Sequence, residues 1–167
     1  MTLDESYFLS GADGGDDDAQ TLDFDKTPTV LLVFAANRFT RSAARHYQTR
    51  YNIGAMDWRM LVMLTKEPNI PAARACQVIG IDKAAISRSL ARLESSGLAR
   101  ATAQARDPRR KNWQLTMKGQ HLHDQILKDA LDRQSQILNG FTEQEVSTLN
   151  GLLRRMLDNM SNMDSRP

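Results

Sequence analysis

The sequence predicts a mainly α-helical chain: a winged helix-turn-helix with a small β-hairpin wing and long N- and C-terminal dimerisation helices. Three observations lead to this fold class. Two short helical segments broken by a glycine span residues 75–90, a basic hairpin-like segment follows them, and longer amphipathic patterns lie on both sides. One helix that fits a major groove, with a cationic wing beside it, is typical of a DNA-binding domain.

The predicted turn of the helix-turn-helix is centred on Gly80. Two helices that cross at a steep angle need a tight turn with a left-handed residue, and glycine adopts that conformation at little steric cost. Asp82 lies where the second helix begins, so its carboxylate is expected to cap the free backbone N–H groups. Ile86, Leu90 and Leu93 recur at helical spacing and form the predicted buried stripe.

The opposite face of this second helix is expected to contact DNA. Small side chains there let the helix approach base edges closely, while Arg88 can reach guanine or a phosphate and Ser87 can bond to either. The residues of this helix that we expect to contact DNA are Lys83, Ala84, Ser87 and Arg88. The helical pattern alone leaves open an alternative, an ordinary helical hairpin with a solvated basic face.

The segment after Gly97, which is expected to end the helix, has the pattern of a wing. Residues 98–102 and 112–115 are strand-like, and residues 106–111 between them hold four cationic side chains and one acid. The positive charges at such a tip repel one another unless an anion lies opposite them. Asp107 can hold the Arg109 guanidinium in a fixed pose for a narrow minor groove. The wing residues that we expect to contact DNA are Arg106, Asp107, Arg109, Arg110 and Lys111.

Long helical patterns flank this region. The first begins near Pro28, since proline is tolerated in a first turn, and a second helix is expected over residues 55–66. A long helix follows Thr116, and Thr142 with Glu145 forms a capping box that opens the last helix. These terminal helices are more apolar than a small winged helix can cover, so beyond their packing within one chain they favour a homodimer.

Together these segments resemble the MarR family of winged-helix regulators over most of residues 30–160. The motifs that carry the resemblance are Trp58-Arg59-Met60-Leu61, the segment 93–100, Asp107-Pro108-Arg109, which matches the family's Asp-x-Arg wing signature, and Leu115-Thr116-Met117-Lys118-Gly119, which matches its Leu-Thr-x-x-Gly exit. The resemblance implies a homodimer on a palindromic operator, usually a repressor, often released by a small anionic aromatic ligand. The family's peroxide sensors carry a cysteine near the start of the first helix, which this chain lacks.

The predicted organisation has four parts. They are an acidic, disordered extension (1–26), an N-terminal dimerisation helix (27–54), the winged helix-turn-helix DNA-binding domain (55–116) and the C-terminal dimerisation helices (117–167). Residues 1–26 hold eight acids and one lysine, a net charge of −7, whereas residues 27–167 hold 21 basic and 12 acidic residues, a net charge of +9. This asymmetry is typical of a nucleic-acid-binding protein. The acidic tail either keeps the chain soluble or competes with DNA for the wing.

A ligand pocket is expected on the first two helices, where the resemblance implies a site for aromatic acids. An arginine or histidine there can receive a carboxylate, and an indole can form a wall against the ring. The candidate ligand-binding residues are Arg38, His46, Tyr47 and Trp58. The alternative is that Tyr47 and Trp58 are simply core residues. His121 and His123 do not suggest a metal site, because residues two apart on a helix point to different faces, and both are expected to be exposed.

Other classes of function find little support in the sequence. The single cysteine, Cys76, permits no disulfide within the chain and fits a reducing compartment, so a cytoplasmic location is expected. No run of about 18 apolar residues predicts a membrane span, and no signal peptide is recognised. We find no nucleophile–base pair, phosphate loop or metal spacing, so we expect no enzyme activity, no metal and no cofactor.

The expected partners are double-stranded DNA, a second copy of the chain and a small aromatic carboxylate. Two alternatives stay open. One is a ligand-blind or architectural winged-helix DNA-binding protein. The other is a protein-interaction module that uses the wing on an acidic partner.

Overall fold

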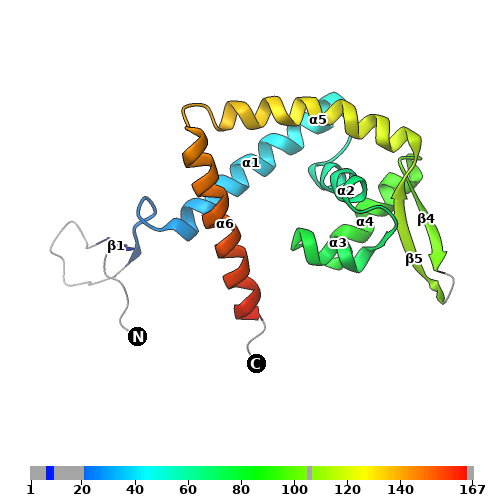
Figure 1. Ribbon diagram of the computed structural model, residues 1–167, viewed down its shortest axis with the longest axis horizontal. Helices are drawn as coiled ribbons and strands as arrows, with labels where there is room; N and C mark the ends of the chain where they lie inside the picture. The colour runs from blue at the N-terminus through cyan, green and yellow to red at the C-terminus, as the bar shows by residue number, and fades with distance from the viewer. Residues whose placement is uncertain (1–6, 10–20, 105–106, 165–167) are drawn as a thin grey trace. The chain divides into compact units, whose positions relative to one another are not determined.

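The computed structural model describes residues 7–9, 21–104 and 107–164 of the 167 residues (Figure 1). The elements in these residues follow in this order: β1 (Phe8–Leu9), β2 (Thr21–Leu22), α1 (Pro28–Tyr51), α2 (Ala55–Lys66), β3 (Ile70–Pro71), α3 (Ala72–Ile79), α4 (Lys83–Ser95), β4 (Ala99–Gln104), β5 (Asp107–Leu115), α5 (Met117–Ile137) and α6 (Glu143–Asp164). The predicted class, a mainly helical winged helix-turn-helix with a small β wing, is confirmed. The chain divides into two compact units, residues 1–120 and 121–167.

Helices α1 and α2 begin where the sequence predicts. Pro28 occupies the first turn of α1, where its missing N–H leaves no hydrogen bond unmade. Asn52 ends α1 in the left-handed conformation, with φ 55°. The Asp57 carboxylate accepts the Gly54 N–H at 3.1 Å and closes the first turn of α2. The predicted bounds of α2, residues 55–66, are those of the structure.

The helix-turn-helix forms around Gly80, which ends α3 with φ 71°. Asp82 is the N-cap of α4, and its Oδ1 accepts the Ala85 N–H at 2.9 Å, as predicted. Ile86, Leu90 and Leu93 are each no more than 1% exposed. The predicted stripe is therefore the core-facing side of α4 and fixes its orientation against the other helices of this unit.

The wing is a three-stranded antiparallel sheet in the order β3-β5-β4. The two predicted runs coincide with parts of β4 and β5 except at Leu98, which precedes β4, and the two strands pair from Ala99↔Leu115 outward. The third strand was not predicted: Ile70 and Pro71 pair with Trp113 and Asn112. Two residues show no alternating pattern, and a proline argues against a strand unless the strand lies at a sheet edge, as β3 does.

The end of α4 and the start of α5 are joined closely at the base of the wing. Gly97, with φ 67°, donates its N–H to Glu94 O at 2.9 Å, and Leu98 donates to Leu93 O at 2.8 Å, which is a Schellman motif. A Cβ on Gly119 would overlap the carbonyl oxygen of Leu98. The glycine of the Leu-Thr-x-x-Gly segment is therefore needed because the backbone at Leu98, just before β4, approaches α5 too closely for any side chain.

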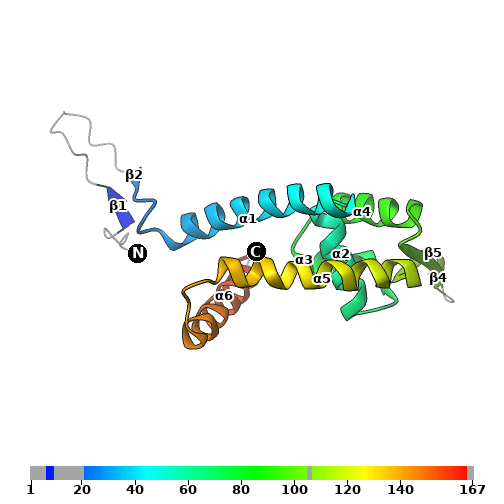
Figure 2. The same cartoon turned by 90° about the horizontal axis from the view of Figure 1, so that it is seen from above.

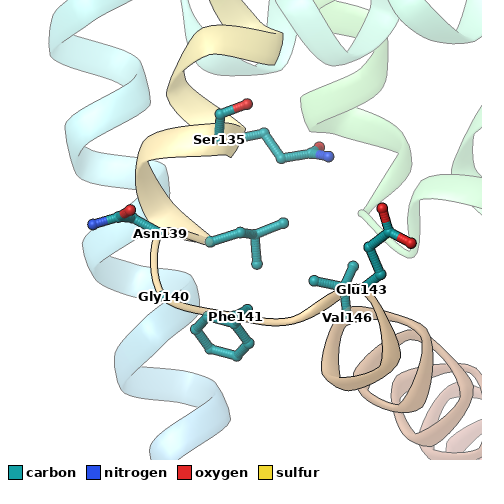
Figure 3. Close-up of a pocket in the computed structure, with 8 residues that line it drawn as sticks. Ser135, Asn139, Gly140, Phe141, Glu143 and Val146 are labelled. Carbon is teal, nitrogen blue, oxygen red and sulfur yellow. The ribbon is translucent and has the colours of Figure 1, made fainter.

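The second unit, residues 121–167, contains the rest of α5 and all of α6. The predicted capping box is present: Glu145 Oε2 accepts the Thr142 N–H at 2.7 Å, and Thr142 Oγ1 accepts the Glu145 N–H at 3.2 Å. The hydrogen bonds that the Glu145 carboxylate accepts from the Thr142 N–H and the Thr142 hydroxyl lower the pKa of Glu145. An open hollow of about 500 Å³ lies at the turn between the two helices, with Ser135, Phe141 and Val146 among the residues around it (Figure 3).

Two sequence expectations need correction. His123 is 7% exposed, with its Nδ1 2.9 Å from Asp124 Oδ1, so the expectation of two exposed histidines is wrong for this residue. In the extension, β1 pairs with β2 through Phe8↔Leu22 and Leu9↔Thr21. The acidic composition predicted disorder there, but apolar residues on both sides of the acidic stretch support a strand pair. Residues 10–20, between the two strands, lie outside the described residues.

None of the described helices has both the length and the apolar character that a membrane span requires.

Candidate nucleic-acid interface

Helix α4 presents to solvent the residues that we expect to contact DNA. Lys83, Ala84, Ser87 and Arg88 are all exposed, whereas Ile86 on the other side is fully buried. Two small side chains and two cationic ones therefore share the outer side of a helix whose inner side is fixed in the core. Such a surface allows close approach to a polyanion with little steric hindrance.

A buried carboxylate, Asp57, connects α4 to α2. Asp57 Oδ1 accepts the Ser89 hydroxyl at 2.6 Å and the Arg92 guanidinium at 2.6 Å, while Oδ2 accepts Arg92 Nε at 3.2 Å. With the Gly54 N–H, this carboxylate receives donors both from the start of its own helix and from α4. The ion pair with Asp57 raises the pKa of Arg92.

The burial of Asp57 gives this connection its strength. The Asp57 side chain is 7% exposed and Ser89 is fully buried, although the Arg92 side chain is 53% exposed. A buried charge is tolerated only when it is paired and hydrogen-bonded, so loss of one donor leaves a costly defect. The arrangement restricts how α4 can rotate or slide on α2, and thereby holds the exposed residues of α4 in one orientation.

The sequence patterns did not predict this network. Its members lie 32 and 35 residues apart along the chain, and neither period nor spacing connects them. One signal was available: Ser89 is polar but falls beside Leu90 on the apolar side of α4. A buried hydroxyl requires a hydrogen-bond partner, and this requirement points to a polar group on a neighbouring helix.

A second ion pair ties α2 to α3 on the surface. The Arg74 guanidinium donates to both oxygens of Glu67, at 2.7 and 2.8 Å. This bidentate pair lowers the pKa of Glu67 and raises that of Arg74. Because both groups are solvated, the pair contributes little to stability and mainly fixes the start of α3.

The wing carries an excess of positive charge. The hairpin of β4 and β5, residues 99–115, contains five lysine and arginine residues and one acid, Asp107. Arg110 and Lys111 are exposed on β5, the strand that follows the hairpin turn. The backbone of Asp107 and Arg109 belongs to β5, but their side chains, and Arg106 entirely, lie outside the described residues.

The candidate ligand residues separate into a cluster and one distant arginine. The Tyr47 ring centroid lies 5.6 Å from that of His46 and 5.8 Å from that of Trp58. Tyr47 is 3% exposed, which favours the core alternative for this residue, while His46 and Trp58 are half-buried. Arg38 is exposed and lies about 13 Å along α1 from Tyr47, given the rise of a helix.

No metal centre is evident in the part of the chain that the structure describes, where no three histidine, cysteine, aspartate or glutamate side chains gather as ligands.

This chain is similar in sequence and in structure to known transcriptional regulators. A protein-family model described as MarR family matches residues 51–110 of the sequence, which cover α2, the helix-turn-helix and most of the wing. The chain is similar to a MarR/EmrR family transcriptional regulator from Acinetobacter sp. ADP1, with 26% identity and a TM-score of 0.79 over 84% of this chain and 99% of that one.

Two further solved structures share the fold. A MarR mutant from E. coli, complexed with operator DNA, is 24% identical with a TM-score of 0.70, over 80% of this chain and 96% of that one. The PcaV transcriptional regulator from Streptomyces coelicolor, in complex with its natural ligand, is 21% identical with a TM-score of 0.70, over 83% of this chain and 96% of that one.

Proposed function

We propose that the chain is a DNA-binding transcriptional regulator of the MarR type, a repressor that binds a palindromic operator as a homodimer and is released by a small aromatic carboxylate. The observation that carries the proposal is the outer side of α4. Its small and cationic side chains are exposed beside a basic wing, while the inner side is fixed by the core and by Asp57.

We assign DNA contacts to two elements. On α4 the contacts are proposed for Lys83, Ala84, Ser87 and Arg88. On the wing they are proposed for Arg106, Asp107, Arg109, Arg110 and Lys111. Base edges in the major groove are read by α4, and the wing binds phosphates and an adjacent minor groove.

A homodimer is supported by the apolar side chains that α6 leaves exposed. Those with more than 40% exposure on this helix are Leu152, Leu157, Met160 and Met163. An exposed apolar surface of this extent marks an interaction site. A two-fold dimer presents two recognition helices about one DNA turn apart, and such a pair reads a palindrome.

The proposed ligand site is the aromatic cluster around Tyr47. His46 and Trp58 are half-buried beside Tyr47, and a cationic group such as Arg38 or His46 can receive a carboxylate. The burial of Tyr47 favours a second candidate function, a ligand-blind winged-helix DNA-binding protein with an ordinary aromatic core at this position.

The proposal is tested by selecting bound duplexes from a random DNA pool and measuring the affinity and stoichiometry of the selected site. We expect a palindrome bound by two chains, with much weaker, salt-dependent binding to a scrambled duplex. Equal affinity for both duplexes would argue for a non-specific architectural protein. Binding of one chain to a single half-site would argue against the dimer.

The ligand is tested with a panel of aromatic carboxylates. Ligands should quench Trp58 fluorescence and weaken operator binding by roughly 1–3 kcal/mol of coupling. Trp113 also fluoresces, so Trp58→Phe is the matched control that isolates the signal. If neither the Trp58 signal nor the operator affinity changes with any member of the panel, the ligand-blind function replaces the ligand-responsive one.

A further inference from the structure

Three consecutive carbonyl groups follow the last turn of α4, and the start of α5 donates a hydrogen bond to each of them. The Lys118 ammonium donates to Ser96 O at 2.8 Å. Thr116 donates its hydroxyl to Gly97 O at 2.7 Å and its N–H to Leu98 O at 3.0 Å. In Figure 2, α5 begins beside the base of the wing, where β4 starts. We call Thr116 and Lys118 the α5 clamp, because they hold the segment that leaves α4.

The Thr116 hydroxyl connects this segment to α5. It donates to Gly97 O and also accepts the Gly119 N–H at 3.1 Å, within the first turn of α5. A Cβ at Gly119 would overlap the Leu98 carbonyl oxygen, so the two backbones are in direct contact. Such close packing leaves no free space between them. The first turn of α5 therefore cannot shift without moving the C-terminal end of α4.

Lys118 differs from the cationic residues of the wing in what its charge contacts. Arg110 and Lys111 are exposed on β5, whereas the Lys118 ammonium lies on the Ser96 carbonyl, at the C-terminal end of α4. This end of a helix carries a partial negative charge, which a cation stabilises. We therefore expect Lys118 to hold α4 in place rather than to bind a DNA phosphate.

The clamp gives α4 a second fixed point, and two fixed points determine its tilt. The first point is the middle of the helix, where Ser89 and Arg92 bind Asp57. This point alone would allow α4 to pivot. Given the rise of a helix, Ser96 lies about 10 Å from Ser89 in one direction and Lys83 about 9 Å from it in the other. A shift of the C-terminal end would thus move the proposed DNA-contacting end by nearly the same distance, and hydrogen bonds to base edges weaken steeply when their geometry is lost.

We propose that the α5 clamp positions α4 for sequence recognition, so that Lys118 and Thr116 contribute to operator specificity without contacting DNA. This inference rests on the proposed function, in which α4 contacts base edges. Loss of the clamp should weaken binding to the operator, which depends on the orientation of α4. Binding to a scrambled duplex should change less, because it depends mainly on phosphate contacts.

The role of Lys118 is tested with the full chain carrying Lys118→Met, which keeps most of the side-chain length but loses the ammonium. Operator and scrambled duplexes are titrated over a range of salt concentrations. We expect operator affinity to fall about fivefold, the low end of the effect of one lost base contact, and the affinity for the scrambled duplex to change little. The slope of log affinity against log salt should stay unchanged, whereas loss of one phosphate contact would reduce it by about 0.9.

Three matched variants control for the loss of a positive charge. Lys111→Met, on the wing, should weaken binding to both duplexes alike and reduce the salt slope. Lys128→Met, at an exposed position of α5 outside the clamp, should leave both affinities nearly unchanged. Lys118→Arg retains a cationic donor for Ser96 O and should restore most of the operator affinity.

The role of Thr116 is tested by comparing Thr116→Val, which keeps the shape of the side chain without its hydroxyl, with Thr116→Ser, which keeps the hydroxyl. We expect the ratio of operator to scrambled-duplex affinity to fall in Thr116→Val and to stay close to the wild-type ratio in Thr116→Ser. Partial unfolding of a variant lowers both affinities by the same factor. The ratio therefore reports the orientation of α4 rather than the stability of the fold.

An affinity ratio that stays unchanged in one variant, Lys118→Met or Thr116→Val, removes that residue from the clamp. Unchanged ratios in both overturn this inference and leave the proposed function intact. A reduced salt slope in Lys118→Met overturns the positioning role of this residue, because it would then bind a phosphate. A wild-type chain that binds operator and scrambled duplexes alike overturns the proposed function, and the role of the clamp with it.

Discussion

Helices α4 and α6 carry similar amphipathic patterns but differ in what covers their apolar sides. On α4, Leu90 and Leu93 are 1% exposed, whereas on α6, Leu152 is 45% and Leu157 is 62% exposed. Both helices begin with a side-chain cap, Asp82 on α4 and Thr142 on α6. Local signals therefore decide that a helix forms and which side is apolar, but not whether that side is covered within the chain or by a partner.

This difference in coverage also separates the folding stability of one chain from the affinity between chains. The packing of α4 is complete within residues 1–120 and is reinforced by Asp57. Substitutions of its buried side chains should therefore lower the free energy of unfolding of a single chain. The exposed apolar side of α6 contributes little to the folding free energy of a single chain. Substitutions there should instead weaken the association of two chains. Substitutions on the two helices can separate these effects.

The largest expected effect comes from Leu90→Ala on α4. Removing a fully buried leucine side chain should lower the free energy of unfolding by about 2–5 kcal/mol, because it creates a cavity in close-packed surroundings. Leu157→Ala on α6 is the matched control. At concentrations where the chain is monomeric, denaturant unfolding should show less than about 1 kcal/mol for this exposed residue. Equal losses for the two variants under those conditions would contradict the comparison.

The next effect concerns the buried carboxylate that fixes α4. Asp57→Ala should cost about 3 kcal/mol of unfolding free energy, since Ser89 and Arg92 lose their acceptor. Because α4 is then held less rigidly, the ratio of operator to scrambled-DNA affinity should also fall. The control is Glu67→Ala, which breaks a solvated pair and should leave the free energy of unfolding nearly unchanged. An unchanged affinity ratio in folded Asp57→Ala would restrict this residue to a purely structural role.

These residues also indicate how far the sequence predicts the molecule. The turn at Gly80, the cap at Asp82 and the capping box at Thr142 were predictable because each depends on residues within a few positions of one another. The Asp57 network was not, because its partners meet only after α2 and α4 have packed together. The burial of His123 was missed for a related reason, since helical spacing alone does not state which side of a helix is covered.

Gly119 was only partly predictable from the sequence. The sequence identified the Leu-Thr-x-x-Gly segment through its resemblance to a family, without a physical reason for the glycine. The structure supplies the reason, a backbone carbonyl at the place where a side chain would begin. The DNA contacts themselves remain predictions, and the wing-tip side chains of Asp107 and Arg109 lie outside the described residues.

A smaller effect separates the two elements of the proposed DNA interface. Arg88→Ala should cost about 1–3 kcal/mol on the operator and less on a scrambled duplex, because α4 is proposed to contact base edges. Arg110→Ala is the matched comparison on the wing and should weaken binding to both duplexes alike, as a phosphate contact does. Fluorescence anisotropy with the two duplexes measures both. Equal losses on operator and scrambled DNA for Arg88→Ala would remove it from the residues that read the sequence.

The smallest expected effect tests the cap of α6, the element whose apolar side the chain leaves exposed. The hydrogen bonds from Thr142 lower the pKa of Glu145 below 4.5, the value that applies without them. A carboxylate with a lowered folded-state pKa stabilises the fold above its unfolded pKa, and this contribution disappears as the pH falls through the folded-state value. The melting temperature of Glu145→Gln should therefore lie slightly below that of wild type at neutral pH, and the gap should close in acid. Glu143→Gln, which removes an acid from the same turn but outside the capping box, controls for the helix dipole. A gap that stays constant from neutral to acid pH would mean that protonated Glu145 caps α6 as well as the carboxylate does, so that the negative charge adds nothing to this cap.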